Sequence, residues 1–319
     1  MKIVIPGGSG QVGTLLARAF HRDGHEVVVL SRHPRSQLWR VVSWDGATAG
    51  SWSNEISGCD AVINLAGRSV NCRYNAANRT AILESRVQST RIVGAAIASA
   101  CRPPRVWLQA STATIYAHRY DGANDEKSGV PGGAEPNAPD TWKFSIDVAR
   151  AWEQTFEDAA TPGTRKVALR SAMTMSPDAG GVFDTLMRLV RRGLGGRAGD
   201  GRQFVSWIHG EDFVRAVCWL MDHDDVDGAV NVAAPNPLPN REFMRTLRDM
   251  SGTVVGLPAS RWMLEVGALF MRTETELILK SRRVVPARLL EGGLTFRFPR
   301  WQDAAADLVG RWRPAASSA

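Results

Sequence analysis

The chain has 319 residues, of which 44% are hydrophobic and 22% charged; this composition excludes a disordered, collagen-like or coiled-coil protein. No apolar run approaches the ~18 residues of a membrane span, and the N-terminus lacks the pattern of a secretory leader, so we expect a cytoplasmic protein without a membrane partner. The formal net charge is +7, but the 39 basic residues are scattered rather than clustered, and we expect no nucleic-acid partner.

Short apolar runs alternate with longer amphipathic segments over the first 110 residues. The predicted strands, rich in β-branched residues and short enough to be buried on both faces, are residues 2–6, 26–30, 61–65 and 105–110. The predicted helices, where apolar residues recur at helical spacing, are residues 12–23 and 76–100. The alternation predicts an α/β fold with a doubly wound parallel sheet of the Rossmann type.

The alternation is less regular in the second half of the chain. Residues 124–140 are rich in Gly, Pro and acidic residues and predict a long loop. Further helices are predicted at residues 141–159 and 211–221, and further strands at 166–170, 203–208 and 229–232. The rest is mainly helical and predicts a smaller substrate lobe. We expect a dinucleotide-binding domain of residues 1–175, to which residues 203–235 return, and a lobe of residues 176–202 and 236–319.

Four cysteines, Cys59, Cys72, Cys101 and Cys218, are far apart and form no CxxC pair. This spacing favours buried free thiols over a zinc site or a disulfide framework. None of the six histidines stands in an HExxH motif, and no metal site is predicted.

A glycine-rich segment joins the first predicted strand to the first predicted helix. It fits the GxGxxG pattern, in which glycines permit a tight turn, let the backbone approach a pyrophosphate and let the helix pack closely on the strand. Backbone N–H groups and the positive end of the helix dipole then face the phosphates. The pattern predicts a dinucleotide site, and the alternative is a turn that serves packing alone. The predicted cofactor residues of this segment are Gly7, Ser9, Gly10, Gln11, Val12 and Gly13.

The end of the second predicted strand indicates which dinucleotide binds. NAD sites commonly place a carboxylate there, whereas this chain has Ser31 and Arg32. A guanidinium binds the 2′-phosphate of NADP with charge-assisted hydrogen bonds, so NADP(H) is predicted, unless Arg32 is only a solvated loop residue. After the next strand, the segment Asn64-Leu65-Ala66-Gly67 contains small residues that let the backbone lie against the adenine-side ribose; an ordinary strand exit with a glycine turn is the alternative.

Several segments resemble the extended short-chain dehydrogenase/reductases, and more closely their atypical subfamily of epimerase family proteins. They are IPGGSGQVG, GHEVVVLSR, DAVINLAG, ILESRVQSTR, SWIHGEDF, NVAAPNPLPNREF and VVPARLLEGGLTFRFP. The resemblance covers nearly the whole chain, with residues 117–140 least alike. It implies that Ser31 and Arg32 contact the 2′-phosphate, Leu65 and Ala66 the middle of NADP, Arg86 the cofactor region and Thr174 the nicotinamide side. It also makes His209 structural.

The catalytic motif of that superfamily, a Tyr with a Lys four residues later, is missing. The three tyrosines have no such Lys, and the expected helix reads FSIDV over residues 144–148. A tyrosine needs such help because its ordinary pKa is ~10. Ser111, or Thr112 beside it, is predicted to hold the substrate oxygen. Tyr116 is the candidate proton donor, with Lys143 or Asp147 as substitutes.

Two functions remain open on the sequence. The first is an NADP-dependent oxidoreductase or epimerase with a degenerate motif, acting on a small carbonyl or alcohol substrate. The second is an NADP-binding regulatory or scaffold protein without turnover. Leu186, Leu189, Val190 and Trp207 are candidate lining of a substrate pocket, and core packing explains them equally well. By analogy with the superfamily, a homodimer is possible.

Overall fold

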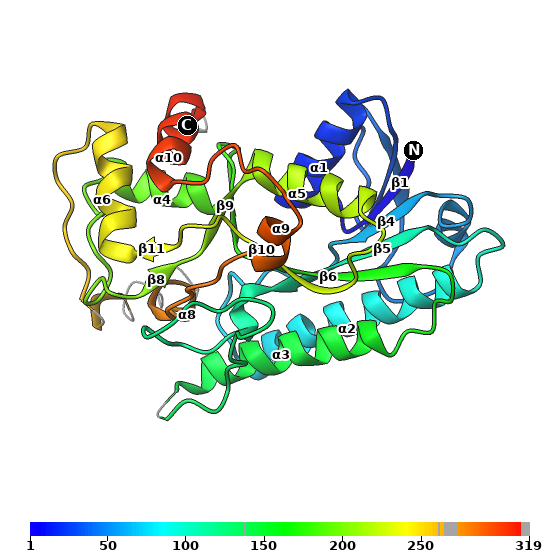
Figure 1. Cartoon of the computed structure of the whole chain (residues 1–319), viewed down its shortest axis with the longest axis horizontal. Helices are drawn as coiled ribbons and strands as arrows, with labels where there is room; N and C mark the ends of the chain where they lie inside the picture. The colour runs from blue at the N-terminus through cyan, green and yellow to red at the C-terminus, as the bar shows by residue number, and fades with distance from the viewer. Residues whose placement is uncertain (137, 261, 265–273, 314–319) are drawn as a thin grey trace.

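Seven strands form one parallel sheet in the computed structural model, which describes residues 1–136, 138–260, 262–264 and 274–313 (Figure 1). Their order is β10-β6-β5-β4-β1-β2-β3. The chain builds outward from β1 to β3 and then returns to build outward from β4 to β10. The crevice at the carboxyl ends of β1 and β4 is therefore the switch point, where such sheets receive ligands. The strands are β1 (Lys2–Pro6), β2 (Glu26–Ser31), β3 (Arg40–Ser43), β4 (Ala61–Asn64), β5 (Val106–Thr112), β6 (Arg165–Ser171) and β10 (Gly228–Val232).

Helices cover both faces of the sheet, because alternate residues of each strand point to opposite sides. Ile3 and Ile5 of β1 pack under α1 (Gln11–Arg22) and α5 (Gly210–Asp222). Val4 of β1 and Trp107 of β5 pack instead on the side of α2 (Ala76–Ala98) and α3 (Asp140–Glu157). Figure 1 shows these two layers above and below the sheet.

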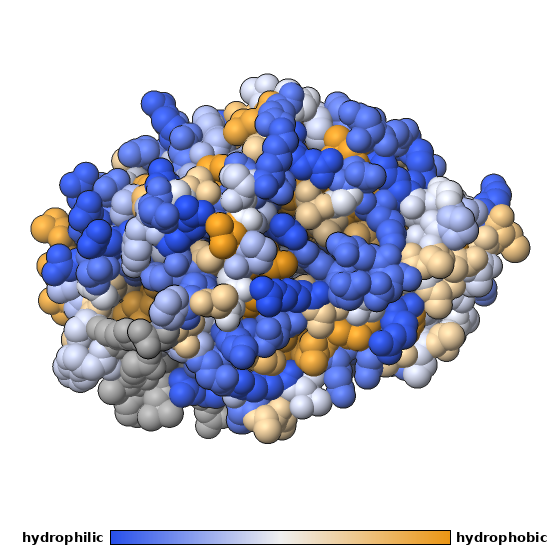
Figure 2. Space-filling view, turned by 60° about the horizontal axis from the view of Figure 1, so that its bottom comes forward, coloured by the Kyte–Doolittle hydropathy of each residue, from blue (hydrophilic) through white to orange (hydrophobic). Residues whose placement is uncertain are grey.

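The outer surface of the α2 and α3 layer is mostly polar. Figure 2, in which the lower side of Figure 1 comes forward, shows hydrophilic residues over much of this face, with smaller apolar areas between them. Among the described residues, no helix is long and apolar enough to cross a membrane.

A second core lies at the end of the molecule away from β3. It holds Trp207, Phe243 and Trp301, with the ring of Phe243 stacked on that of Trp301 at 4.0 Å. The helices around it are α4 (Val182–Arg191), α6 (Asn240–Ser251) and α10 (Trp301–Arg311). The remaining short elements are β7 (Met173–Met175), β8 (Phe204–Val205), β9 (Trp207–His209), β11 (Leu238–Pro239), η1 (Ser51–Glu55), η2 (Ala113–Ile115), α8 (Glu276–Leu279) and α9 (Ala287–Glu291).

Residues near the C-terminus complete the core that holds Ile3 and Ile5 of β1. Leu289 of α9 is fully buried in the cluster that holds Ile3 and Val230, and α9 packs beside β10. The guanidinium of Arg288 donates to the backbone carbonyl of Ala229 at 3.0 Å. β10 pairs with β6 in the main sheet, whereas Val205 and Trp207 lie in the second core. The division of the chain into residues 1–175 with 203–235, and a lobe of residues 176–202 and 236–319, stays a prediction.

Two sequence predictions need correction. The single strand expected over residues 203–208 is wrong: it divides at Ser206 into β8, which pairs antiparallel with β11, and β9, which pairs parallel with β7. The Ser206 hydroxyl donates to the Arg282 carbonyl and accepts from the Val284 amide, which holds the break in place. The expectation of buried thiols is correct for Cys59 but wrong for Cys101, which is exposed.

Candidate functional site

The turn after β1 presses its backbone against the end of β4. Gly7 has φ of 73°, and a Cβ atom built on it would lie 2.6 Å from the Cα of Ala66. A Cβ on Gly13 would lie 2.4 Å from the Cα of Gly8. Real Cβ atoms do not approach so closely, so these two positions need glycine. The structure thus brings Gly7, Gly13, Leu65 and Ala66 together at the switch point.

The N-terminus of α1 opens toward this crevice without a side-chain cap. Its N-cap residue is Gly10, which has no side chain to accept from the amides of the first turn. The nearest atom to a Cβ on Gly10 would be 3.9 Å away, so the space beside it is open. Uncapped amides at the positive end of a helix dipole are suited to a phosphate group. The amides of Gln11, Val12 and Gly13 belong to this turn.

The side chain of Gln11 has a buried polar atom without a partner. Its Nε2 atom makes no hydrogen bond to any described residue. The same amide lies against Gly181, the N-cap of α4, where a Cβ would collide with it. An unsatisfied donor next to an open phosphate cradle is what a missing anionic ligand would leave, and the residues at this turn therefore fit a dinucleotide.

The end of β2 reaches the same turn through two hydroxyl groups. Ser31 is 2% exposed, and its Oγ donates to the Oγ of Ser9 at 3.1 Å. The amide of His33 donates to the Ser31 Oγ at 3.2 Å. Arg32 is exposed, and its guanidinium makes no hydrogen bond or ion pair to a described residue. The unpaired guanidinium of Arg32 thus lies just after β2, at the position where NAD-binding proteins commonly have a carboxylate.

Two buried side chains fix the loop after β4. The Nδ2 of Asn64 donates to the Oε1 of Gln109 at 2.9 Å, and the Oδ1 of Asn64 accepts from the Ala66 amide at 3.1 Å. Arg86 holds the next residues, because its Nη1 donates to the carbonyls of Arg68 and Ile82 at 3.0 Å each. Its guanidinium also lies over the Trp152 ring, and burial lowers the pKa of Arg86 to about 10. Arg86 therefore shapes the loop rather than standing free.

The two predicted catalytic hydroxyls belong to one buried polar network. The Ser111 Oγ donates to Oε1 of Glu153 at 2.5 Å, and Arg170 pairs with both oxygens of Glu153 at 2.9 and 2.8 Å. Nη1 of Arg170 then donates to the Tyr116 hydroxyl at 3.1 Å, and that hydroxyl donates to Oδ1 of Asn231 at 2.9 Å. Ser111 and Tyr116 are joined through Glu153 and Arg170 rather than to each other.

The network governs the proton affinity of the phenol. Burial raises the pKa of Tyr116, while the charge and the hydrogen bond of Arg170 act in the opposite direction. The phenol is therefore a neutral donor near pH 7, and the guanidinium stands where it would stabilise a phenolate. Tyr116 is 3% exposed and Ser111 is 7% exposed.

The other candidate side chains have ordinary contacts. Thr112 accepts from the amide of Thr114 and caps η2. Lys143 and Asp147 are exposed on α3, without an ion pair to a described residue. Thr174 is 8% exposed in β7, where it pairs with Ile208.

The apolar residues suggested as pocket lining lie mostly in or beside the second core. Val190 and Trp207 are completely buried in that core, and Leu186 packs against it. Leu189 is half-buried. Core packing, the alternative left open on the sequence, therefore accounts for Val190 and Trp207.

His209 joins two elements, as the family resemblance implies. Its Nδ1 accepts from the Glu211 amide at 3.1 Å and caps α5, and its Nε2 lies 3.1 Å from Oδ2 of Asp307 on α10. The imidazole packs on Phe298, and burial lowers the pKa of His209.

The sequence analysis missed two groups of charged residues. Glu153 and Arg170 are 17 positions apart on different elements; a charged residue at the end of a buried strand was the only local signal for the pair. A second group joins α8 to the start of α3: Ser145 donates to Oε2 of the buried Glu276, and Nζ of Lys280 donates to the Thr114 carbonyl at 2.8 Å. Burial raises the pKa of Glu276 and lowers the pKa of Lys280 to about 8.

Two family models match the chain. The NAD dependent epimerase/dehydratase family matches residues 3–233, and a domain of unknown function, DUF1731, matches residues 259–308. Among the described residues, no group of three or more His, Cys, Asp or Glu side chains is placed to hold a metal ion.

Relatives align over almost their whole length. The epimerase family protein SDR39U1 of Bos taurus is 32% identical over 97% of this chain and all of its own, and YfhF of Bacillus subtilis is 28% identical over 97% and 98%. The crystal structure of human SDR39U1 (isoform 2) with NADPH has a TM-score of 0.84 at 28% identity, covering 97% of this chain and 99% of that one. UDP-N-acetylglucosamine 4-epimerase from Bacillus cereus, at 16% identity and a TM-score of 0.75, shows the fold alone.

Proposed function

The chain belongs to the NAD dependent epimerase/dehydratase family, and we propose that it binds NADP(H) and acts as an oxidoreductase or epimerase on a small carbonyl or alcohol substrate. The observation that carries the proposal is the contact of Gly7 with Ala66 beside the uncapped end of α1. The NADPH in the human SDR39U1 structure supports the choice of cofactor.

The proposed cofactor contacts follow the crevice from β2 to β7. The amides of the segment Gly7, Ser9, Gly10, Gln11, Val12 and Gly13 bind the diphosphate. Arg32, with Ser31 beside it, binds the 2′-phosphate. Leu65 and Ala66 lie against the ribose, Arg86 positions their loop, and Thr174 borders the nicotinamide. NADPH, when bound, supplies a hydride for a carbonyl carbon.

The proposed proton donor is Tyr116. Arg170 replaces the missing lysine, because a guanidinium 3.1 Å from the phenol favours the phenolate that remains after proton donation. Ser111 orients the substrate oxygen in this proposal, for which it must exchange its bond to Glu153 for one to the substrate. A regulatory or scaffold protein without turnover is the second candidate, favoured by the burial of both hydroxyls and by their bonds within the protein.

The test combines binding with turnover. The full chain is titrated with NADPH and with NADH by calorimetry. Aldehydes and ketones are then screened for loss of absorbance at ~340 nm, and nucleotide sugars are screened by NMR for their epimers, because an epimerase returns the hydride and consumes no cofactor overall. Tighter binding of NADPH than NADH together with turnover supports the enzyme. Binding without turnover on every substrate favours the regulator, and no binding of either nucleotide contradicts both.

A further inference from the structure

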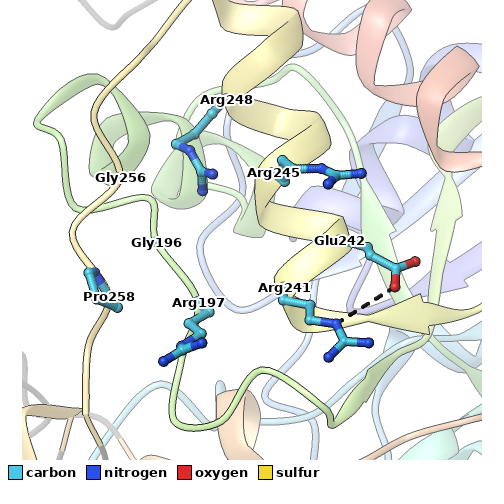
Figure 3. A pocket seen from close by; sticks show the side chains of 8 residues that line it. All are labelled: Gly196, Arg197, Arg241, Glu242, Arg245, Arg248, Gly256 and Pro258. Carbon is cyan, nitrogen blue, oxygen red and sulfur yellow. Dashed lines mark ion pairs between the residues drawn. The ribbon is translucent and has the colours of Figure 1, made fainter.

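A second hollow lies on the part of the molecule built around α6. Its volume is about 450 Å³, and it is bounded by the loop at residues 193–201, by the outer face of α6 and by residues 256–258 (Figure 3). In Figure 1, α6 and the phosphate turn after β1 stand well apart, with α4 and α5 between them. The hollow is therefore separate from the proposed dinucleotide site. Its lining residues are Gly196, Arg197, Arg241, Glu242, Arg245, Arg248, Gly256 and Pro258.

The lining carries four guanidinium groups and one carboxylate. Arg197 and Arg245 make no side-chain hydrogen bond or ion pair to any described residue. Arg241 has a loose ion pair, 3.8 Å long, with its neighbour Glu242. Arg248 donates from Nη1 to the carbonyl of Gly195 at 2.7 Å and has no carboxylate partner in the described chain. Positive charge is thus largely uncompensated within the protein.

The spacing of these arginines works against the helix that carries them. Arg241, Arg245 and Arg248 stand three and four positions apart on α6, so their like charges repel along one face. Arg197 adds a fourth charge from the neighbouring loop. Such repulsion weakens α6 slightly unless an anion lies between the groups. The arrangement is therefore better suited to a bound state than to the free protein.

Glycines leave room for the arginine stems. A Cβ on Gly256 would lie 2.5 Å from Cδ of Arg248, and a Cβ on Gly201 would lie 2.9 Å from Cβ of Arg241. Gly196 runs so close to Leu257 that a Cβ there would lie 2.3 Å from the Leu257 carbonyl oxygen. Figure 3 shows Arg248 reaching from α6 toward the segment of Gly256 and Pro258, with Arg197 on the loop below it. The backbone is thus shaped around these side chains.

We propose that this hollow binds a small molecule carrying two neighbouring phosphate groups. Guanidinium groups bind phosphate oxygens through paired, charge-assisted hydrogen bonds, and four of them, three on α6 and one on the neighbouring loop, offer more sites than one phosphate occupies. The volume falls within the ~300–1,000 Å³ of small-molecule sites. A concave site of this size fits a metabolite better than the extended backbone of a nucleic acid. The inference is independent of the proposed function.

The test uses sodium pyrophosphate as the probe. The full chain is titrated by calorimetry at ~0.1 M salt, and orthophosphate is titrated for comparison. Pyrophosphate is expected to bind more tightly than orthophosphate. The double variant Arg197→Gln/Arg245→Gln removes two groups without intramolecular partners and is expected to weaken pyrophosphate at least tenfold. Arg91→Gln is the matched control, because Arg91 is an exposed arginine of α2 without an ion pair in the described chain.

Further measurements make each outcome decisive. Circular dichroism and thermal unfolding establish that the variants are folded, and Arg245→Gln alone is the fallback variant. NADPH affinity is expected to stay unchanged in all of them; if NADPH binds to none, the proposed function fails while the arginine-dependent binding of pyrophosphate still supports this site. Pyrophosphate that binds equally to the double variant and competes with NADPH overturns the inference, because it then occupies the phosphate turn. Arginine-dependent binding of a DNA duplex without pyrophosphate binding also overturns it.

Discussion

Gly7 and Ala66 pack backbone against backbone, so closely that a Cβ on Gly7 would lie 2.6 Å from the Cα of Ala66. This contact joins the turn after β1 to the end of β4 and fixes the floor of the crevice at the switch point. It depends on a residue without a side chain and with φ of 73°.

The first prediction distinguishes the effect of the close contact between Gly7 and Ala66 from the effect of a positive φ angle alone. Gly7→Ala is expected to lower the free energy of unfolding by ~3 kcal/mol and to weaken NADPH at least tenfold, because the loop after β4 must move. Gly24→Ala is the control: its φ is 80°, but no atom lies within 4 Å of its Cβ position. It is expected to cost only ~1 kcal/mol and to leave NADPH affinity intact. Urea unfolding and calorimetry measure both; equal effects of the two changes would contradict the prediction.

The second prediction concerns the choice of nucleotide. Arg32→Gln removes the free guanidinium after β2 and is expected to weaken NADPH by at least tenfold while changing NADH less than twofold. Arg35→Gln, a nearby exposed arginine, serves as the control. Parallel titrations give the ratio of the two affinities. An equal loss of affinity for NADPH and for NADH would contradict a contact between Arg32 and the 2′-phosphate.

The third prediction distinguishes the catalytic role of Tyr116 from a structural one. Tyr116→Phe removes a hydroxyl that contacts Arg170 and Asn231, and it is expected to cost ~1–2 kcal/mol of unfolding free energy. If Tyr116 is the proton donor, kcat on a substrate found by the panel falls ~100-fold or more with little change in KM. Tyr120→Phe is the control, since Tyr120 is 39% exposed. If Tyr116→Phe lowers the free energy of unfolding but leaves kcat unchanged, Tyr116 has only a structural role.

The fourth prediction follows from Lys280, which is 1% exposed and faces Arg282, Glu276 and Glu135. Burial lowers the pKa of Lys280 from 10.5 to about 8, so between these values the unfolded chain holds more protons than the folded one. Stability contributed through this group therefore rises with pH across that window and is lowest below pH 8. Relative to Lys280→Met, the wild type should gain up to ~3 kcal/mol between pH 8 and pH 10.5.

Urea unfolding at several pH values measures this difference. Lys143→Met, which removes an exposed lysine, is the control and should show no such trend. A stability gap between wild type and Lys280→Met that is constant with pH would contradict the assignment of the shift to Lys280.

Local patterns were sufficient for most of the sheet. The expected strand at residues 2–6 is β1 without change, and the strands at 26–30 and 61–65 differ from β2 and β4 by one residue. These runs are continuous, apolar and rich in β-branched residues, which is the pattern of a parallel strand buried on both faces. Arg40–Ser43 was missed because an edge strand with only two apolar residues has too little pattern to separate it from a loop.

The polar network was less accessible to sequence analysis. The glycine pattern predicts a turn because all of its residues lie within seven positions of the chain. The contact of Arg170 with Tyr116, in contrast, forms only when β5, β6 and α3 have packed together. The contact of Arg86 with Trp152 depends in the same way on how α2 lies against α3. Charged pairs between distant elements depend on how the helices and strands pack against one another, which a single sequence does not reveal.

The burial of Leu289 beside Val230 has a consequence for synthesis on the ribosome. The half that holds the seven-stranded sheet is translated first, yet the flank of its last strand, β10, is covered by α9, which is made more than 50 residues later. Until that helix emerges, the nascent chain exposes an apolar sheet edge of the kind that chaperones recognise and that neighbouring chains can join. A fragment that stops where the epimerase match ends, at residue 233, would keep that edge permanently open.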